Sequence, residues 1–485
     1  MNALSRQPLL PLAALTAALV LAAFARVSGR GGGPALDAAP ELMNRGASFT
    51  TPAAADSAPV PYTVLPGDSL SGIAARFGTT VDALIAANGL VDPDGLAAGQ
   101  VLTVHVAPDG DGPGTALLPD TELVNGRAYV GFDVVSWLAA QRGRLSAHAE
   151  LVDGELLTGP EIVARVASEF SVGPRVLLAF VEARSGWVAG GGDPEAREYA
   201  AGLVDPSRAA LWFQLNWLAD RLNGGYYDFK TRDGALLTLA DGTRLRAHPG
   251  IGAGTFAVQR AMALQSDAAI LETRLDAFAA AYRALFGEPW GYAAPPVDPE
   301  TLRFPALALP FAPGERWWLT GGPHGGWGEG SAWAALDFVP DEAERGCFTS
   351  SRWATAVADG VVAADGAGQV WLDLDGDGDV RTGPVVLYLH LAADGRAPVG
   401  ARPSAGDPVG RPSCEGGFSN ATHLHMARLQ DGEWLAASGS AAMELGGWRT
   451  FGADRSYDGG LAQAGGTRRE ACECRQRGIN DVTAR

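Results

Sequence analysis

The sequence predicts a multidomain α+β protein with a small βααβ module first, a mainly helical domain in the middle and an antiparallel β-sheet domain towards the C-terminus. Three observations predict this. The 485 residues correspond to about three domains of ordinary size, and a hydrophobic content of 47% supplies each with a core. Apolar residues recur with helical periodicity through the middle of the chain. Beyond it, they fall in short runs between Gly, Asp and Pro turns.

The charge of the chain excludes one class of partner. The formal net charge is −18, and Lys230 is the only lysine. Because no basic patch is available to neutralise phosphates, we expect no nucleic-acid partner.

The N-terminus has the pattern of an export signal. Arg6 precedes an apolar run over 8–24, and Ala23-Phe24-Ala25 offers a small-x-small cleavage site. We therefore interpret 1–25 as a signal peptide or an uncleaved anchor, which would be the only contact with a membrane. Residues 26–60 are Gly, Ala, Pro and Ser with few large apolar side chains, so they predict a disordered linker and a secreted or extracytoplasmic protein.

The next unit, over 61–106, has a βααβ pattern. Residues 62–64 alternate as a short strand, and a Gly-Asp-Ser turn precedes a helix over 70–77. A second helix follows over 81–88, and 102–104 form the returning strand.

This unit, YTVLPGDSLSGIAARFGTTVDALIAANGLVDPDGLAAGQVLTV, resembles a LysM module over essentially its whole length. The resemblance implies binding of N-acetylglucosamine-containing glycans such as peptidoglycan in a shallow groove, although a βααβ spacer without a ligand is the alternative. The residues that would line the groove are Gly67, Asp68, Ser69, Leu70, Asn88, Gly89 and Leu90.

The middle domain, over 117–296, is mainly helical by periodicity. Helices are predicted at 160–170, from 176, at 208–222 and at 254–286.

SVGPRVLLAFVEARSGW in this domain resembles the lysozyme-like fold of lytic transglycosylases. Those enzymes carry a glutamate directly before the Ser-Gly as general acid, whereas this chain has Arg184 there. Arginine does not release a proton at working pH. We therefore expect a scaffold or a glycan-binding cleft without glycoside chemistry.

A domain over 305–450 is predicted to consist of β-strands and contains four of the seven histidines, among them His390. Strands are predicted at 353–362, 369–374, 385–390 and 423–429. In His423-Leu424-His425 the two imidazoles project to the same face of a strand, as two groups that share a metal or a water must. Together with another histidine on a neighbouring strand and an aspartate at the end of an upstream run, this predicts a metal site.

AALDF, ATAVADGVV, VVLYLHL, AGDPVG and THLHMA follow in order the core of the lysostaphin-like, LytM-type zinc endopeptidases, with a resemblance over about 317–428. The resemblance implies that Asp337 and His425 are Zn2+ ligands. His390 and His423 would orient or deprotonate the attacking water and stabilise the oxyanion.

One ligand departs from the family pattern. The family's first zinc histidine stands four residues before the aspartate, where this chain has Trp333. Because indole offers no lone pair to a metal, two hypotheses compete. Either His324 in the upstream Gly-Gly-Pro-His-Gly-Gly loop replaces the ligand, or the domain has lost the metal.

An acidic segment precedes His390. Asp373, Asp375, Asp377 and Asp379 alternate around two glycines, which matches the first half of a calcium loop. Pro384 stands where the closing glutamate is expected, so Ca2+ binding and a plain acidic turn both remain open.

Four cysteines fit an oxidising compartment. Cys347 and Cys414 are expected to form a disulfide, with two buried thiols as the alternative. Cys472 and Cys474 fall in a C-terminal tail over 451–485, either stapled or disordered.

Together these features predict an exported, cell-wall-associated, peptidoglycan-binding zinc metalloendopeptidase that cuts peptide bonds in cross-links. The alternative is a non-catalytic wall-binding scaffold or an activator of another hydrolase. The sequence leaves the bond specificity open.

Overall fold

The computed structural model describes residues 58–484, apart from 65–67, 78, 91, 93–94, 98, 107–109, 191–196, 232–234, 299–301 and 303. The predicted signal and most of the predicted linker lie outside the described residues. Within the described part of the chain, no helix combines the length and the hydropathy that a membrane crossing requires.

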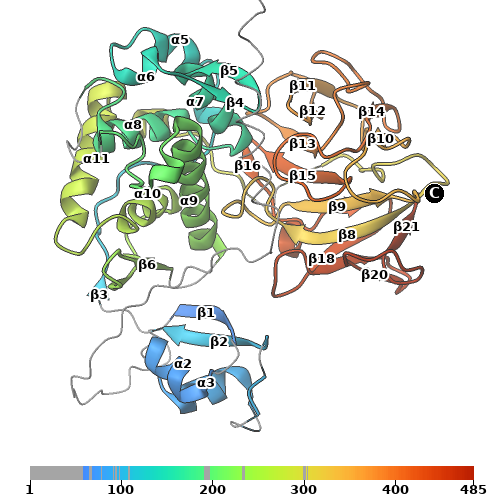
Figure 1. Cartoon of the computed structure of the whole chain (residues 1–485), viewed down its shortest axis with the longest axis horizontal. Helices are drawn as coiled ribbons and strands as arrows, with labels where there is room; N and C mark the ends of the chain where they lie inside the picture. Colours follow the sequence, from blue (N-terminus) through green and yellow to red (C-terminus); the bar gives the residue numbers. More distant parts are fainter. Residues whose placement is uncertain are drawn as a thin grey trace, which may run out of the picture. The chain divides into compact units, whose positions relative to one another are not determined.

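The N-terminal unit has the predicted βααβ order (Figure 1). It consists of β1 (Ala58–Thr63), α2 (Leu70–Phe77), α3 (Val81–Asn88) and β2 (Val101–Val106). The strands are antiparallel, with Thr63 opposite Val101. Thr80 caps the start of α3 by accepting a hydrogen bond from the Ala83 N–H, and Gly89 ends the helix at φ 58°. Its core is closed by fully buried side chains from α3 and β2, among them Leu84 and Leu102.

The middle region is mainly helical, as predicted. Its helices are α4 (Asp120–Leu123), α5 (Val134–Ala139), α6 (Arg144–Ala147), α7 (Gly159–Glu169), α8 (Pro174–Ser185), α9 (Leu211–Thr231), α10 (Ala253–Ala263) and α11 (Leu271–Phe286). Short strands accompany them: β3 (Gly110–Asp111), β4 (Ala149–Val152), β5 (Glu155–Thr158), β6 (Leu236–Thr238) and β7 (Arg244–Arg246). Thr158 and Glu161 form a capping box at the start of α7.

The helix predicted over 254–286 is two helices. The Asp267 carboxylate accepts hydrogen bonds from the backbone N–H groups of Ala269 and Ile270, and so favours a turn before α11 begins.

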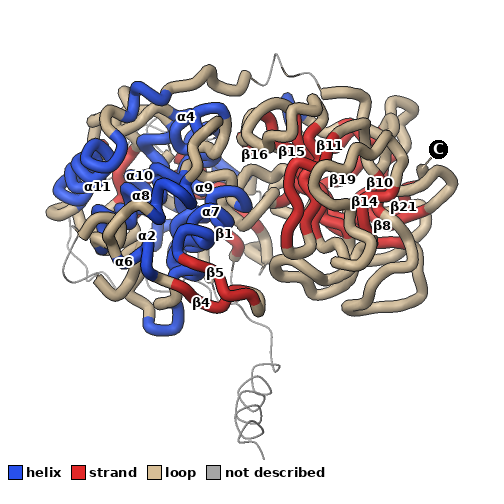
Figure 2. The backbone as a smooth tube through the Cα atoms, turned by 90° about the horizontal axis from the view of Figure 1, so that it is seen from above, coloured by secondary structure: helices blue, strands red, loops and turns tan. Residues whose placement is uncertain are grey.

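The C-terminal region is built on an eight-stranded sheet of order β11-β12-β13-β15-β9-β8-β21, with β16 paired to β15. The strands are β8 (Arg316–His324), β9 (Ala335–Pro340), β11 (Val361–Gly366), β12 (Gln369–Asp373), β13 (Pro384–Leu389), β15 (Leu424–Gln430), β16 (Glu433–Trp434) and β21 (Asp481–Thr483). All of its pairings are antiparallel, as predicted. Figure 2 shows the strands of this region gathered together.

Smaller sheets complete this region. They contain β10 (Ala354–Thr355) with β14 (Pro408–Gly410), and β17 (Glu444–Leu445), β18 (Trp448–Gly452), β19 (Gly459–Ala462) and β20 (Arg468–Glu470). The run predicted as one strand at 353–362 is divided between β10 and β11. The Ala356 N–H bonds to the Asp407 carbonyl beyond β10, so the chain leaves one sheet before it enters the next.

Residues 451–485 differ from the expected tail. They contribute β19, β20 and β21, and β21 pairs with β8 so that Thr483 lies opposite Arg316. The Val482 side chain is fully buried. Cys472 and Cys474 form a disulfide. A three-residue strand with one buried side chain carries too little periodicity for the sequence to reveal it.

The helical and β regions share one hydrophobic core. Side chains of β12, β13, β15 and β16, including Trp371 and Trp434, belong to the same buried cluster as the side chains of α7 to α11. The other face of the large sheet packs on a second cluster that includes Trp317 and Tyr388.

Candidate metal centre

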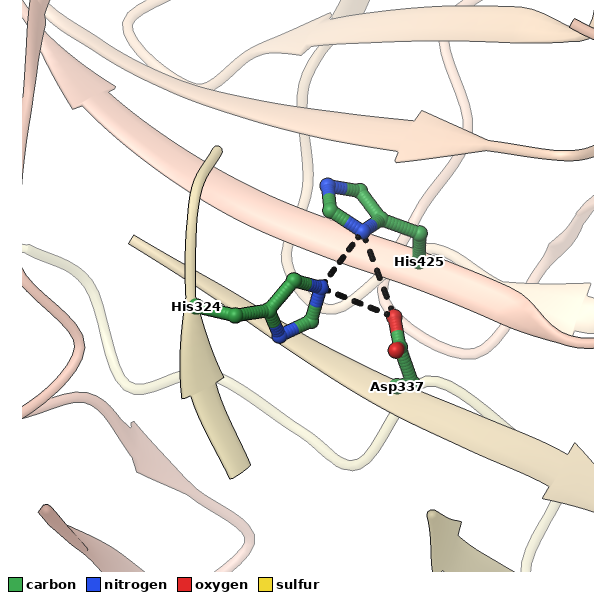
Figure 3. A group of neighbouring side chains, drawn as sticks. All are labelled: His324, Asp337 and His425. Carbon is green, nitrogen blue, oxygen red and sulfur yellow. Dashed lines mark hydrogen bonds and ion pairs between the residues drawn. The ribbon is translucent and has the colours of Figure 1, made fainter. Parts of the chain in front are cut away.

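Three side chains from neighbouring strands converge on one point (Figure 3). His324 ends β8, Asp337 lies on β9 and His425 lies on β15. The Asp337 Oδ1 is 3.3 Å from the His324 Nε2 and 3.2 Å from the His425 Nδ1, and these two nitrogens are 3.0 Å apart. All three side chains are buried.

Strand register brings this group together. Asp337 lies directly opposite His425 in the antiparallel ladder, which places both side chains on the same face of the sheet. The register between β8 and β9 shifts twice between Leu319 and His324, and such irregularities re-aim side chains. A Cβ at Gly321 would lie 2.5 Å from the Asp337 Oδ2, so glycine is required beside the carboxylate.

Backbone carbonyls fix the orientation of both imidazoles. The His324 Nδ1 donates to the Gly322 carbonyl at 2.8 Å, and the His425 Nε2 donates to the Gly326 carbonyl at 2.9 Å. Because a carbonyl oxygen only accepts, the outer nitrogen of each ring carries the proton. In the neutral form of each ring, the inner nitrogen therefore presents a lone pair towards the centre of the group.

A positive charge among these three atoms is favourable, and either a proton on the His324 imidazole or a bound cation supplies it. The Asp337 Oδ1 is buried and has no hydrogen-bond donor among the described residues. Burial opposes ionisation of Asp337, but the charges of His324 and His423 hold its pKa well below the usual value. Burial likewise opposes the charge of His324, yet the Asp337 carboxylate raises the pKa of this imidazole. Two imidazole nitrogens and a carboxylate oxygen form a donor set that fits Zn2+.

His390 and His423 lie beside this group. Their rings are 4.4 Å apart, and the His423 Nε2 is 3.7 Å from the Asp337 Oδ1. Each donates its Nδ1 proton to a carbonyl, His390 to Glu415 at 3.0 Å and His423 to Ala421 at 2.8 Å, so that in the neutral form of each ring Nε2 is an acceptor. Burial lowers the pKa of His390 to about 3, so this ring is neutral at physiological pH.

His390 also has a strained backbone, with φ 65° directly after β13. Its carbonyl accepts hydrogen bonds from the Ser413 N–H at 2.6 Å and from the Ser413 hydroxyl at 3.1 Å. Cys414 follows Ser413 and forms a disulfide with Cys347, with a Cα–Cα distance of 5.6 Å. The disulfide therefore holds the segment that positions His390.

His324 is the last residue of β8 and not a loop residue as expected. Trp333 occupies the family's usual ligand position, and its carbonyl accepts a hydrogen bond from the Ala437 N–H. The spacing along the sequence could not show that His324 is part of β8, because the register between β8 and β9 is irregular.

Tyr457 is a site residue that sequence reasoning missed. Its ring stacks on His324 with centroids 4.1 Å apart and an interplanar angle of 18°. It is half-exposed and has φ 71°, and its N–H donates to the Pro323 carbonyl. It falls in the segment expected to be a tail, where only the fold brings it to the site.

The acidic segment after β12 forms a tight turn. Its first three aspartates, Asp373, Asp375 and Asp377, come close enough to share an ion. However, Asp373 already accepts hydrogen bonds from the N–H groups of Asp375 and Gly378. Asp379 pairs instead with Arg381. These contacts account for the segment as a turn, and Ca2+ binding has no further support.

Two of the residues expected to line a glycan groove, Asn88 and Leu70, stabilise the fold of the unit. The Asn88 side chain donates to the Leu84 and Thr103 carbonyls at 2.8 Å and accepts from the Thr103 N–H at 2.6 Å. It therefore ties α3 to β2. Leu70 is buried in the core of the unit.

The remaining groove residues lie at the helix ends, except Gly67, which is outside the described residues. Asp68 accepts a hydrogen bond from the Tyr62 hydroxyl, and Ser69 caps α2 through the Gly72 N–H. Gly89 ends α3, and Leu90 follows it against the core.

Comparison with known families assigns two regions. The model of the LysM domain matches residues 62–105, and the model of the LasA N-terminal domain matches residues 116–298. The chain carries a LysM domain. The LasA match covers the region predicted to be lysozyme-like, and the lysozyme-like fold of that region stays a prediction.

Curated relatives that match include a protease and a LysM effector. Protease LasA of Pseudomonas aeruginosa is 23% identical over 367 residues, which cover 71% of this chain and 81% of LasA. The secreted LysM effector ECP6 of Passalora fulva is 45% identical over 51 residues, which are 10% of this chain. This chain spans only 22% of the length of ECP6. The predicted resemblance to a LysM module and to lysostaphin-like peptidases is thus confirmed.

Among solved structures, the M23 metalloprotease pseudoalterin from the deep sea is 22% identical and is covered to 96% of its length, with 35% of this chain. The catalytic domain of lysostaphin from Staphylococcus simulans is 21% identical and is covered to 88%, with 25% of this chain. Their TM-scores are 0.29 and 0.18.

Proposed function

We propose that this chain is an exported, peptidoglycan-binding zinc metalloendopeptidase that hydrolyses peptide bonds in cell-wall cross-links. The observation that carries the proposal is the convergence of the His324 Nε2, the Asp337 Oδ1 and the His425 Nδ1 within 3.0 to 3.3 Å. In their neutral forms both imidazoles direct their protons outwards, which leaves the inner atoms free to hold a cation.

His324, Asp337 and His425 would hold Zn2+. When bound there, zinc would supply Lewis acidity for the scissile carbonyl and for a water nucleophile. In their neutral forms, His390 and His423 present acceptor Nε2 atoms beside this group, so either would accept the proton of the water. The low pKa of His390 keeps this ring neutral at physiological pH.

The LysM domain supports a cell-wall substrate. The LysM effector relative is described as secreted, and LasA is described as a protease. We propose that the module binds N-acetylglucosamine-containing glycan and raises the effective concentration of the peptidase region near wall peptides.

Elemental analysis of purified full-length protein tests the metal. We expect about one zinc per native chain and a strong reduction in His324→Ala. His148→Ala is the control, because His148 pairs with Glu150 outside the site. Equal zinc in native protein and His324→Ala would remove His324 from the ligand set.

Digestion of purified peptidoglycan tests the reaction. New amino groups that disappear when a chelator is added support an endopeptidase. Binding of the wall without cleavage and without zinc would replace the proposal with a non-catalytic scaffold or a hydrolase activator.

A further inference from the structure

The loop between β8 and β9 lies between the candidate ligands His324 and Asp337 and contacts the helical domain. It covers residues 325–334 and follows His324 directly. At its start, the Gly326 carbonyl accepts the hydrogen bond of the His425 Nε2 at 2.9 Å. Near its other end, the Gly330 N–H donates to the Asp220 Oδ1 of helix α9 at 2.7 Å.

Internal hydrogen bonds make this glycine loop a single unit. The Gly326 N–H donates to the Ala332 carbonyl at 3.1 Å, and the Trp327 N–H donates to the Ser331 hydroxyl at 3.1 Å. A displacement at Gly330 is therefore transmitted across the loop to Gly326.

The loop is in close contact with the helical domain. A Cβ at Gly330 would lie 1.9 Å from the Asp220 carbonyl oxygen, and a Cβ at Gly328 would lie 2.7 Å from the Asp220 Oδ1. The Trp327 ring meets Phe170 edge-on, with centroids 6.4 Å apart. Only glycine allows such an approach of loop and helix backbones.

The opposite side of the loop is fixed as well. A Cβ at Gly326 would lie 2.4 Å from the Trp434 ring. Trp434 is buried, its indole N–H donates to the Phe170 carbonyl at 3.0 Å, and its backbone N–H donates to the Tyr227 hydroxyl of α9 at 2.9 Å. Gly326 is thus held between its loop partner and a ring that the helical domain fixes.

We propose that Asp220 is a positioning residue for the metal centre. By holding Gly330, it keeps the Gly326 carbonyl aligned with the His425 Nε2 and so keeps the His425 Nδ1 lone pair aimed at Asp337. The helical domain then acts as part of the site's support and not as a spacer. This inference rests on the proposed function, because it assigns these atoms to a metal.

Zinc affinity of the full-length chain, measured by competition with a chromophoric chelator, tests the proposal. Loss of a group that orients a metal ligand costs about 10–100-fold in metal affinity. Asp220 does not contact His425 directly but acts through the loop that contains the Gly326 carbonyl. We expect Asp220→Ala to bind zinc about tenfold more weakly. Asp220→Asn keeps an acceptor oxygen and should restore native affinity to within about twofold. Asp228→Ala is the matched control, because it removes an α9 carboxylate that pairs with Arg260.

A second measurement does not depend on zinc. Imidazole ¹⁵N spectra of the metal-free chain should show His425 protonated at Nε2 in native protein and in Asp220→Asn, and a mixture of tautomers in Asp220→Ala. Asp220→Ser, whose hydroxyl is too short to reach Gly330, replaces Asp220→Ala if thermal unfolding shows that the alanine variant does not fold.

The outcomes separate the two proposals. Native zinc affinity and a native His425 tautomer in a folded Asp220→Ala or Asp220→Ser variant would overturn the positioning role. If native protein binds no zinc, the proposed function fails, and the His425 spectrum alone decides whether Asp220 positions this ring.

Discussion

The LysM unit completes its fold within residues 58–106, whereas the metal centre joins His324 to a partner 101 residues further along the chain. In the LysM unit, consecutive strands and helices form their own core. In the metal centre, three strands supply the ligands and helix α9 supports the loop beside them. Local patterns are therefore sufficient for the first region, while the second depends on long-range register.

The largest expected effect is at Asp337, whose carboxylate lies close to three imidazoles. Asp337→Asn keeps the shape of the side chain but removes its charge, so zinc affinity should fall at least about a hundredfold. This exceeds the usual loss of affinity when a residue that only orients a metal ligand is removed. Isothermal titration with zinc measures this. Asp365→Asn, an exposed position on β11 of the same sheet, should bind as the native protein does. Unchanged binding in Asp337→Asn would remove the carboxylate from the site.

The next effect tests how strongly long-range links hold the β region. The Cys347–Cys414 disulfide closes a separation of 67 residues. On the chain-entropy estimate, Cys347→Ser with Cys414→Ser should cost about 4 kcal/mol of unfolding free energy. Denaturant unfolding under non-reducing conditions measures it. Because Ser413 and Glu415 hold His390, we also expect loss of peptide hydrolysis before global unfolding. Full activity in the double variant would contradict this link.

The LysM unit should respond locally. Asn88→Ala removes three hydrogen bonds, two of them between α3 and β2, and we expect a loss of about 1–3 kcal/mol in local stability. Amide hydrogen exchange of α3 and β2 in the full chain measures it, with exposed Asp82→Asn as control. If protection is unchanged while glycan binding is lost, Asn88 serves the ligand and not the fold.

The smallest effect is at the boundary between the helical and β regions. Glu169 is buried, pairs with Arg165 at 3.0 Å and accepts a hydrogen bond from Gln369 at 2.8 Å. Burial raises its pKa above the ordinary value, so the folded state takes up a proton more readily than the unfolded state. Stability from this group therefore falls as pH rises through the raised pKa.

Glu169→Gln should remove this dependence. We expect the variant to be slightly more stable than native protein at neutral pH, with the difference vanishing below the unfolded-state pKa of about 4.3. Denaturant unfolding at a series of pH values measures it. Asp153→Asn, which changes the exposed partner of Arg165, should show no such trend. A difference that grows towards acid pH would contradict the sign.

Sequence patterns predicted the regular elements well. The helix over 70–77 and the strands near 369–374 and 423–429 correspond to α2, β12 and β15. The sequence patterns failed where the hydrophobic periodicity was short or interrupted. The helix over 254–286 divides because Asp267 favours a turn, and the final strand has only one fully buried apolar side chain.

The sequence by itself determined the βααβ module, the antiparallel C-terminal sheet and the residue types suited to a metal, because these depend on periodicity and side-chain chemistry. Only the tertiary structure placed His324 beside Asp337 despite Trp333, brought Tyr457 onto His324, and joined Asp220 to the glycine loop. Strand register and the contacts of distant backbones decide such positions, and no local pattern encodes them.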